Sequence, residues 1–159
     1  MRFYKKMRTT AVKCIGQCEL DSPNMHLKFH QVIESRLDQI DEIVQRVMTR
    51  VRRMPGARRH LEEVTLALAE AVANAVIHGN RSDPGKKITI CGGCENGRTL
   101  VLVITDEGEG FDPSGLPDPT VSENIFATHG RGVFLIKQLM DQAEYRKGGR
   151  QLVLRKRLS

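Results

Sequence analysis

The chain has no tryptophan and few aromatic residues of any kind. Phe and Tyr together make up 4% of its 159 residues. Proteins that hold single-stranded nucleic acid without reading its sequence stack the bases on aromatic side chains. A stacking surface of that kind is therefore not expected.

Long apolar runs are also missing. No stretch approaches the roughly 18 apolar residues that suggest a membrane-spanning helix. The basic residues at the N-terminus are not followed by the apolar core of a secretory signal. We therefore expect a cytoplasmic protein without membrane contact, in which the four cysteines would be mostly reduced.

The charge is unbalanced, with 25 Lys and Arg against 19 Asp and Glu and a formal net charge of +6. The excess lies in residues 1–8, 50–59 and 146–157. A basic balance favours acidic partners, although solvated surface charge explains it equally well. No DNA-reading motif accompanies the basic tracts, so direct nucleic-acid binding is not predicted. If it did occur, its affinity would fall steeply with salt.

The length suits one domain, preceded by an extension at residues 1–24 that shows some strand tendency at residues 11–15. Alternating apolar residues predict a strand at 25–30. Apolar residues at three- and four-residue steps predict helices at 34–54 and 58–78, the first stopped by Pro55-Gly56 and the second by Gly79-Asn80.

The second half of the chain begins with a hairpin signal. Asn96-Gly97 separates predicted strands at 87–91 and 98–105. A long loop at 106–129, a helix at 132–141 and a strand at 152–158 follow. Strands paired by a hairpin, with helices between strands, predict an α/β (α+β) sandwich of two layers in a domain spanning 25–159.

Glu70 and Asn74 form the first candidate site. They are four residues apart in a very apolar helix and share one face of it. Burying a carboxylate and an amide is costly unless each has a partner. The Asn oxygen suits Mg²⁺, and a Glu one turn away can act as a general base. Alternatively, both side chains simply bond to backbone or face solvent.

The second candidate is DEGEGFDP, residues 106–113, directly after an apolar strand. Asp106 can accept a hydrogen bond from an exocyclic amine such as that of adenine. Gly108 and Gly110 allow the backbone to approach a flat ring. A plain acidic turn would explain the same residues.

The third candidate is Gly130-Arg131-Gly132, which we place at the N-terminus of a helix. Free amides and the helix dipole favour phosphate there, and Arg131 could add a charge-assisted contact. A helix that simply starts after a flexible loop is the alternative.

Taken in order, these motifs resemble the ATP-binding domain of the GHKL superfamily, the Bergerat fold. Within it, the chain looks like the anti-sigma factor serine kinases of bacterial partner-switching systems. The matching segments are MHLKFH, EAVANAVIHGN, DEGEGFDP and HGRGVFLIKQLMD, and the resemblance spans residues 24–159. It implies a mixed sheet that is covered on one face by helices.

The resemblance also implies roles for individual residues. Asn74 would coordinate the Mg²⁺ that bridges the ATP phosphates, and Glu70 would be the catalytic base. Asp106 would bind the adenine amine. The remaining expected contacts are Gly108 and Gly110 along the base, residues 112–129 as a lid, Gly130, Arg131 and Gly132 on the phosphates, and His78 at the rim.

The implied activity is transfer of the ATP γ-phosphoryl group to a Ser or Thr of an antagonist, an anti-anti-sigma protein. The kinase would also bind and inhibit a sigma factor or a similar regulator, and relatives of this shape often form homodimers. The alternative is a module that binds ATP and captures a regulatory partner without useful phosphoryl transfer.

Two departures from the family pattern stand out. Arg150 and Gln151 replace a Thr that the family usually has near the last strand, and Gln151 could still hydrogen-bond to the base. For the Arg on the first helix that meets protein partners, both Arg36 and Arg46 are candidates.

The cysteines raise a separate question. Cys91 and Cys94 form a C-x-x-C motif, to which Cys14 and Cys18 could add two more zinc ligands. Residues three apart on a regular strand point to opposite faces of a sheet, so zinc binding is not favoured.

Overall fold

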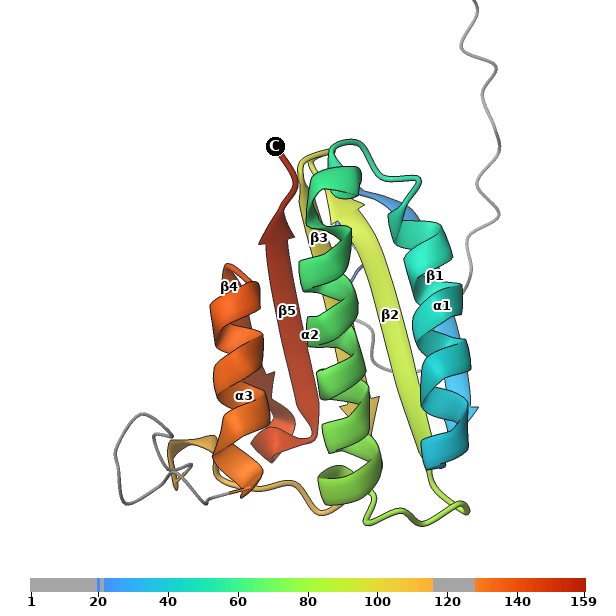
Figure 1. The fold of residues 1–159 in the computed structure, drawn as a ribbon, viewed down its shortest axis with the longest axis vertical. Coiled ribbons are helices and arrows are strands. Elements are labelled where there is room, and N and C mark those ends of the chain that lie inside the picture. Colours follow the sequence, from blue (N-terminus) through green and yellow to red (C-terminus); the bar gives the residue numbers. More distant parts are fainter. Residues whose placement is uncertain (1–19, 21, 116–127) are drawn as a thin grey trace, which may run out of the picture.

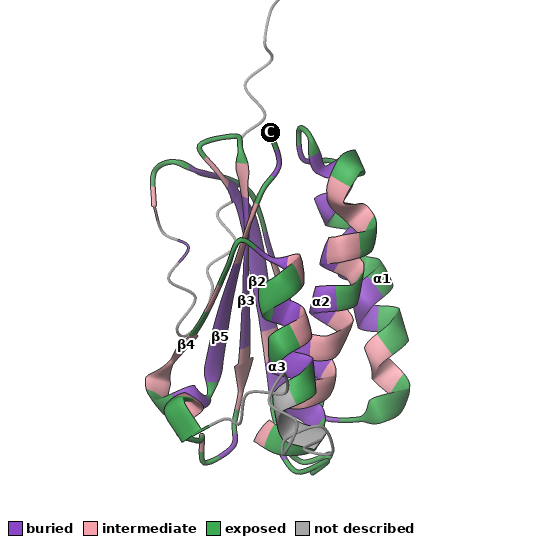
Figure 2. Cartoon of the chain, turned by 60° about the vertical axis from the view of Figure 1, so that its left-hand side comes forward, coloured by how far each residue is buried: buried purple, intermediate pink, exposed green. Residues whose placement is uncertain are grey.

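The computed structural model describes residues 20, 22–115 and 128–159. Three helices cover one face of a five-stranded sheet, so the predicted two-layer α/β sandwich is confirmed (Figures 1 and 2). The strands lie in the order β1-β2-β3-β5-β4. Their bounds are β1 Met25–Glu34, β2 Lys87–Glu95, β3 Thr99–Asp106, β4 Gln142–Arg146 and β5 Gln151–Arg157. The helices are α1 Ile40–Val51, α2 Leu61–Asn74 and α3 Thr128–Leu139.

All four strand pairings of the described sheet are antiparallel, so the expectation of a mixed sheet is wrong. The connections explain why. Asn96 and Gly97 both have positive φ, as a tight hairpin between β2 and β3 requires. Between β1 and β2, α1 and α2 run in opposite directions and return the chain to the end at which β1 stops (Figure 1).

The core lies between the helices and the sheet. Helix α1 buries the positions that the three- and four-residue spacing predicts, and α2 does the same with smaller side chains. Alternate residues of the central strands face them, including Ile88, Ile90, Leu100, Leu102 and Leu154. No helix in the described part of the chain is long and apolar enough to span a membrane.

Several helices and strands begin or end at residues other than those predicted. Strand β1 continues to Glu34, because Val32 and Ile33 pair with β2, and α1 therefore begins only at Ile40. Strand β4 was not predicted, since its sequence QAEYR is mostly polar and lies at an edge of the sheet. Helix α3 begins at Thr128, four residues earlier than expected.

The two cysteines of β2 lie on opposite faces of the sheet, as predicted. Cys91 packs with Val101, Val103 and Val153, whereas Cys94 belongs to the core beneath the helices. Cys94 is a free thiol whose pKa is raised by burial. Cys91 is disulfide-bonded, so the expectation of reduced cysteines is wrong at this position.

No group of three or more His, Cys, Asp or Glu residues within the described ranges could hold a metal ion. The predicted strand tendency at residues 11–15, Cys14, Cys18 and most of the expected lid fall outside the described residues. The assignment of residues 1–24 as an extension therefore stays a prediction.

Gly56 lies in the connection between α1 and α2 and packs against the backbone just after β5. Its φ is +80°, and a Cβ there would overlap the carbonyl oxygen of Leu158. Gly97, at φ +67°, has nothing within 4 Å of such a Cβ. Both substitutions to Ala carry the cost of a left-handed conformation, but only Gly56→Ala adds a backbone clash.

We expect Gly56→Ala to lower the free energy of unfolding by about 2–4 kcal/mol and Gly97→Ala by about 1–2 kcal/mol. Urea unfolding of the two variants beside the wild type measures both values. Equal losses would show that the contact with Leu158 contributes nothing.

Candidate functional site

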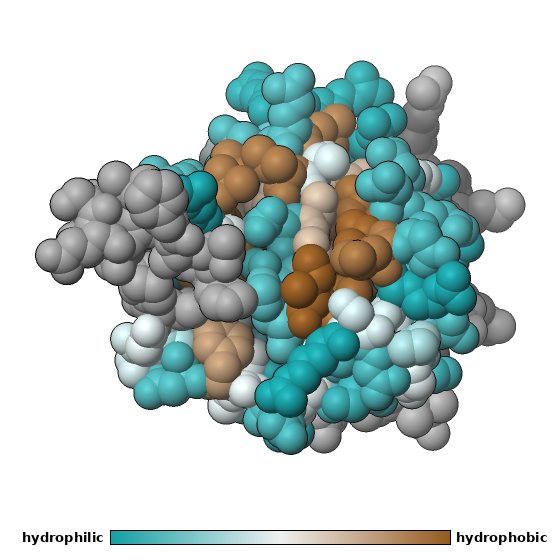
Figure 3. Space-filling view, turned by 60° about the horizontal axis from the view of Figure 1, so that its bottom comes forward, coloured by the Kyte–Doolittle hydropathy of each residue, from teal (hydrophilic) through white to brown (hydrophobic). Residues whose placement is uncertain are grey.

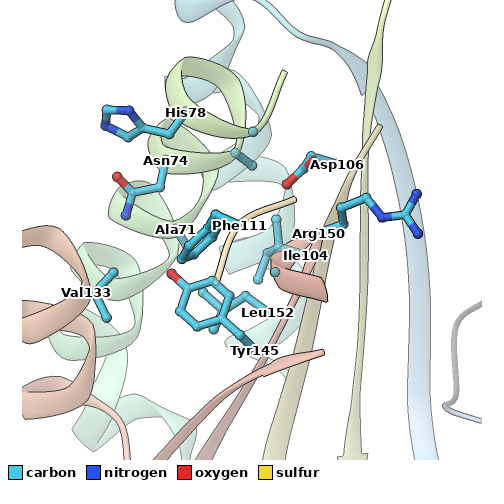
Figure 4. A pocket seen from close by; sticks show the side chains of 13 residues that line it. Ala71, Asn74, His78, Ile104, Asp106, Phe111, Val133, Tyr145, Arg150 and Leu152 are labelled. Atoms are coloured by element: carbon cyan, nitrogen blue, oxygen red, sulfur yellow. The ribbon is translucent and has the colours of Figure 1, made fainter. Parts of the chain in front are cut away.

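A cavity of about 300 Å³ opens between the C-terminal end of α2, the sheet and α3 (Figure 4). Its walls are mostly apolar, with a few polar side chains at its edges. Ligand sites are typically lined in this way, by apolar walls and a few polar groups that orient the ligand. The lining residues are Ala71, Asn74, Ala75, His78, Gly79, Ile104, Asp106, Phe111, Val133, Tyr145, Gly149, Arg150 and Leu152.

Asp106 lies at the end of β3, and its carboxyl is one of the polar groups of the cavity. Burial raises the pKa of this carboxyl, and the backbone N–H of Gly108 and the charges of Arg150 and Lys86 oppose the rise. The N–H of Gly108 donates to Oδ1 of Asp106 at 2.8 Å, which leaves the second oxygen available to a ligand. Asp106 is therefore a fixed acceptor in an apolar cavity.

The loop after β3 lies close to the end of α2. A Cβ on Gly108 would overlap the carbonyl oxygen of Gly79, so only Gly fits there. Gly110 lies beside the turn before β5, where the N–H of Phe111 donates to the carbonyl of Gly148 at 2.9 Å. These two glycines shape the loop that borders the cavity, although neither lines it.

Asn80 was predicted only to end the second helix, which it does, and its side chain also holds this part of the site together. Its amide donates to the carbonyl of Lys87 at 2.9 Å and accepts from the N–H of Glu107 at 2.8 Å. The side chain is completely buried. Its position at the end of the motif EAVANAVIHGN was the one available signal. Asn80 thus fixes the start of β2 and the loop after β3 against the end of α2.

Glu70 and Asn74 lie one turn apart on α2 and both contact α3. A Cβ on Gly132 would overlap Oε1 of Glu70 and lie 3.0 Å from Nδ2 of Asn74. Nδ2 of Asn74 is buried and has no hydrogen-bond partner among the residues that the structure describes. A buried donor without a partner is costly, so this amide is poised for a ligand. Asn74 lines the cavity and Glu70 lies just beyond it.

The segment Gly130-Arg131-Gly132 lies inside α3 rather than before it. Because the helix begins at Thr128, Gly132 follows the first turn, where backbone amides bond within the helix. Gly132 instead allows α3 to approach α2 at Glu70. Gly130 and Arg131 remain in the first turn, and Arg131 is exposed.

Two aromatic side chains missed by the sequence analysis close the cavity. Phe111 and Tyr145 meet edge to face, with ring centroids 5.0 Å apart, and face Ala71 and Asn74 across the cavity (Figure 4). Burial, followed by the charges of Asp106 and Glu70, raises the pKa of Tyr145 to about 12. The Tyr145 hydroxyl therefore stays neutral near both carboxylates.

The mouth of the cavity lies at one end of the molecule (Figure 3). Apolar residues are exposed there among polar ones (Figure 3), and Phe111, which lines the cavity, is also exposed. His78 is exposed and lines the cavity, and its expected part in nucleotide binding stays a prediction.

Comparison with known proteins identifies the family. Residues 33–156 match the histidine kinase-like ATPase domain. The chain belongs to this family.

Individual members of this ATPase family resemble the chain at modest identity. It is 30% identical over 104 residues to an anti-sigma F factor of Clostridium acetobutylicum, covering 62% of the chain and 71% of that protein. It is 37% identical over 98 residues to the serine-protein kinase RsbW of Staphylococcus epidermidis and 29% identical over 96 residues to that of Bacillus subtilis. These matches cover 56% and 57% of the chain, and 60% and 59% of the two kinases.

A solved structure supports the ATPase-domain fold. A crystal structure of the RsbU and RsbW domains of a Mycobacterium tuberculosis protein matches 82% of the chain and 31% of that protein, with a TM-score of 0.56. At 14% identity this likeness concerns the fold alone.

The two departures from the ATPase-family pattern can now be placed. Gln151 faces the side of the sheet away from the helices, where its amide donates to Oγ1 of Thr105 at 3.1 Å. The expectation that Gln151 could bond to a base is therefore wrong, because alternation along β5 turns Leu152 toward the cavity instead. Arg150 lines the cavity with its stem, and its guanidinium points away (Figure 4).

Of the two arginines considered for partner contact, only Arg46 lies on α1, where it pairs with Glu42. Arg36 precedes the helix and makes a two-pronged contact with Asp38, at 3.0 and 2.8 Å. The role of either residue in partner binding stays a prediction.

Proposed function

We propose that the protein is an anti-sigma factor with ATP-dependent serine kinase activity. The observation that carries the proposal is the placement of Glu70 one helical turn from Asn74, whose buried Nδ2 has no hydrogen-bond partner among the described residues, next to a cavity whose other polar end is Asp106. The names of the anti-sigma F factor and the RsbW kinases support the same function.

The nucleotide would place its base in the apolar cavity. Asp106 would accept a hydrogen bond from the adenine amine, and Phe111 and Tyr145 would border the base. Gly108 and Gly110 would keep the loop backbone close to the ring. His78 would lie at the rim, toward the phosphates.

Mg²⁺ suits the phosphate end of this site. The ion takes few protein ligands and keeps waters and substrate phosphates. That preference agrees with a site that offers one amide and one carboxylate instead of a cluster of acidic residues. Asn74 would be the protein ligand, and the ion would neutralise charge that develops on the phosphates.

In the proposed reaction, Glu70 accepts the proton of a serine or threonine hydroxyl on the antagonist protein. The hydroxyl oxygen attacks the γ-phosphorus, the bond to the β-phosphate oxygen breaks, and ADP leaves. Gly130, Arg131 and Gly132 would contribute through the first turns of α3, with Gly130 and Arg131 nearest the phosphates. Phosphorylation of the antagonist would weaken its docking by like charge and desolvation.

The partners follow from the same proposal. The substrate is an anti-anti-sigma protein, and the kinase freed from it would sequester a sigma factor or a similar regulator. That the protein acts in the cytoplasm and as a homodimer stays a prediction.

A second function is favoured by one contact. Gly132 packs directly against the carboxylate of Glu70, which is only partly exposed beside α3. A module that binds ATP and captures a partner without phosphoryl transfer would keep this packing throughout. The two functions differ in whether Glu70 accepts a proton from a partner hydroxyl when the nucleotide is bound.

The first test is Mg²⁺-dependent ATP binding, measured by calorimetry. We expect Asn74→Ala to weaken ATP binding about tenfold or more in Mg²⁺ and much less in EDTA, because one ion ligand is lost. Thr49→Ala, on the exposed side of α1 and away from the cavity, is the control and should leave affinity unchanged. Equal losses for Asn74→Ala with and without Mg²⁺ would remove Asn74 as the metal ligand.

A further inference from the structure

A second concave site lies at the end of the molecule opposite the cavity, between the α1–α2 connection, the β2–β3 hairpin and the end of β5 (Figure 1). We call it the arginine pocket. Its volume is about 530 Å³. It is lined by Arg52, Met54, Pro55, Gly56, Arg58, Arg59, Gly97, Leu158 and Ser159.

The local sequence RVRRMPGARR builds this pocket. Met54 and Ala57 are buried and anchor the connection on the core. Gly56 brings it against the backbone of Leu158, whose N–H donates to the carbonyl of Arg98 at 2.7 Å. Arg52 and Arg53 precede these buried residues, Arg58 and Arg59 follow them, and all four arginines are exposed. The pocket therefore has an apolar floor and a basic rim.

The rim charges have no partner within the part of the chain that the structure describes. Arg52, Arg53, Arg58 and Arg59 make no ion pair or side-chain hydrogen bond there. Five other surface arginines make ion pairs with a carboxylate, namely Arg36, Arg46, Arg81, Arg146 and Arg155. The arginines without an ion pair to a described residue elsewhere on the surface are Arg50, Arg98, Arg131, Arg150 and Arg157, which are spread along the chain, whereas four gather within residues 52–59.

The nearby carboxylates do not neutralise the rim. Glu63 is bound to Lys156 at 2.7 Å, and Glu95 is bound to Arg155 at 2.5 Å. Glu62 is exposed on the first turn of α2 and forms no ion pair with these arginines. The nearby carboxylates thus pair with other residues or form no ion pair with these arginines, and the positive charge around the pocket is not neutralised. Such a cluster of positive charge attracts anionic partners.

We propose that the arginine pocket binds an acidic segment of a partner protein, with one apolar side chain on the pocket floor and carboxylates on the surrounding arginines. The guanidinium group of arginine can donate two parallel hydrogen bonds to the two oxygens of a carboxylate. Met54, Pro55 and Leu158 offer an apolar floor. None of the lining residues is aromatic, so the pocket offers no aromatic ring on which bases could stack. An acidic peptide therefore fits it better than a nucleic acid.

This inference goes beyond the proposed kinase function and does not depend on it. The pocket and the nucleotide cavity share no lining residue. A partner held by the arginine pocket would leave the mouth of the cavity open. The protein could then hold one partner at this end while the other end handles nucleotide and substrate.

The test measures binding of a short fluorescein-labelled peptide of Asp and Glu with one central Leu, by anisotropy at low salt and without nucleotide. The variant Arg52→Glu/Arg58→Glu/Arg59→Glu should lose about tenfold or more in affinity. The control Lys28→Glu/Lys87→Glu/Lys137→Glu changes net charge equally on β1, β2 and α3, and should lose much less. Thermal unfolding confirms that both variants fold.

Two further probes separate the alternatives. The same peptide with Ser in place of Leu should bind the wild type several-fold more weakly, and single-stranded oligothymidine should bind more weakly still. Equal losses for the two triple variants would reduce the effect to net charge and overturn the proposal. Oligothymidine binding as tight as the peptide would also overturn it, and would assign the pocket to nucleic acid. Because no nucleotide is present, failure here leaves the kinase proposal intact.

Discussion

Replacing Asp106 with Asn is expected to lower ATP affinity roughly 10- to 100-fold while leaving the protein folded. The carboxylate is a buried acceptor at the end of β3, held by the N–H of Gly108 at 2.8 Å. An Asn can keep that bond through its own oxygen. It would then present an amide donor where the adenine amine needs an acceptor.

Protonation of Asp106 is expected to change ATP binding and protein stability in opposite directions. Because burial raises its pKa in the folded protein, the ionised carboxyl destabilises the fold at pH values above that raised pKa. The cost disappears as pH falls below the usual range of a free Asp. Asp106→Asn should therefore be as stable as the wild type, or more stable, at neutral pH, and this advantage should vanish in acid.

ATP binding should show the opposite trend with pH. Wild-type affinity should fall as pH drops through the raised pKa of Asp106, because the protonated carboxyl is a poorer acceptor. The affinity of Asp106→Asn should lack this step. Calorimetry over a series of pH values, with thermal unfolding at each, measures both effects.

Inosine triphosphate provides the matched control, since it carries an oxygen acceptor where ATP carries the amine. The wild type should prefer ATP, and Asp106→Asn should narrow or reverse the preference. If the variant weakens the binding of both nucleotides equally, Asp106 helps to shape the pocket but does not distinguish the two bases.

The sequence predicted the parts of the site that lie in local motifs at the ends of elements. Glu70 and Asn74 follow from helix periodicity, and Asp106 from its place after an apolar strand. In each case the neighbours in sequence determine where the side chain points. The positions of these residues could therefore be predicted before the fold was known, and their chemical roles stay predictions.

The parts that failed depend on pairing between distant segments. Tyr145 reaches the cavity because β4 pairs with β5, yet the sequence of β4 is too polar to be recognised as a strand. Gln151 turned out to face away because the register of β5 against β3 sets its side, opposite Thr105. Asn80 fixes two loops that approach each other only in the folded chain.

The start of α3 was misplaced for a different reason. Gly130 and Gly132 read as the flexible boundary of a helix, since Gly is unfavourable inside one. In the structure Gly132 lies within α3 because any larger residue would meet Glu70 and Asn74. A tertiary contact has overridden local helix propensity, which a single sequence does not reveal.

Replacing Glu70 with Gln is expected to slow phosphoryl transfer to the cognate anti-anti-sigma protein about 10²- to 10⁴-fold, the range typical of a lost general base. Affinity for ATP should change little, because Glu70 lies beyond the cavity that would hold the base. Gln has nearly the same shape and keeps the packing against Gly132. Transfer from radiolabelled ATP and calorimetry of nucleotide binding measure the two quantities separately.

Glu63→Gln is the matched control for this experiment. Glu63 lies on the same helix two turns earlier, and its carboxylate is bound to Lys156 and His60 rather than directed toward the cavity. Its loss should leave transfer unchanged. If Glu70→Gln transfers phosphate at the wild-type rate, another group must be the base. If the wild type binds ATP and transfers nothing, the protein acts by capture of its partner.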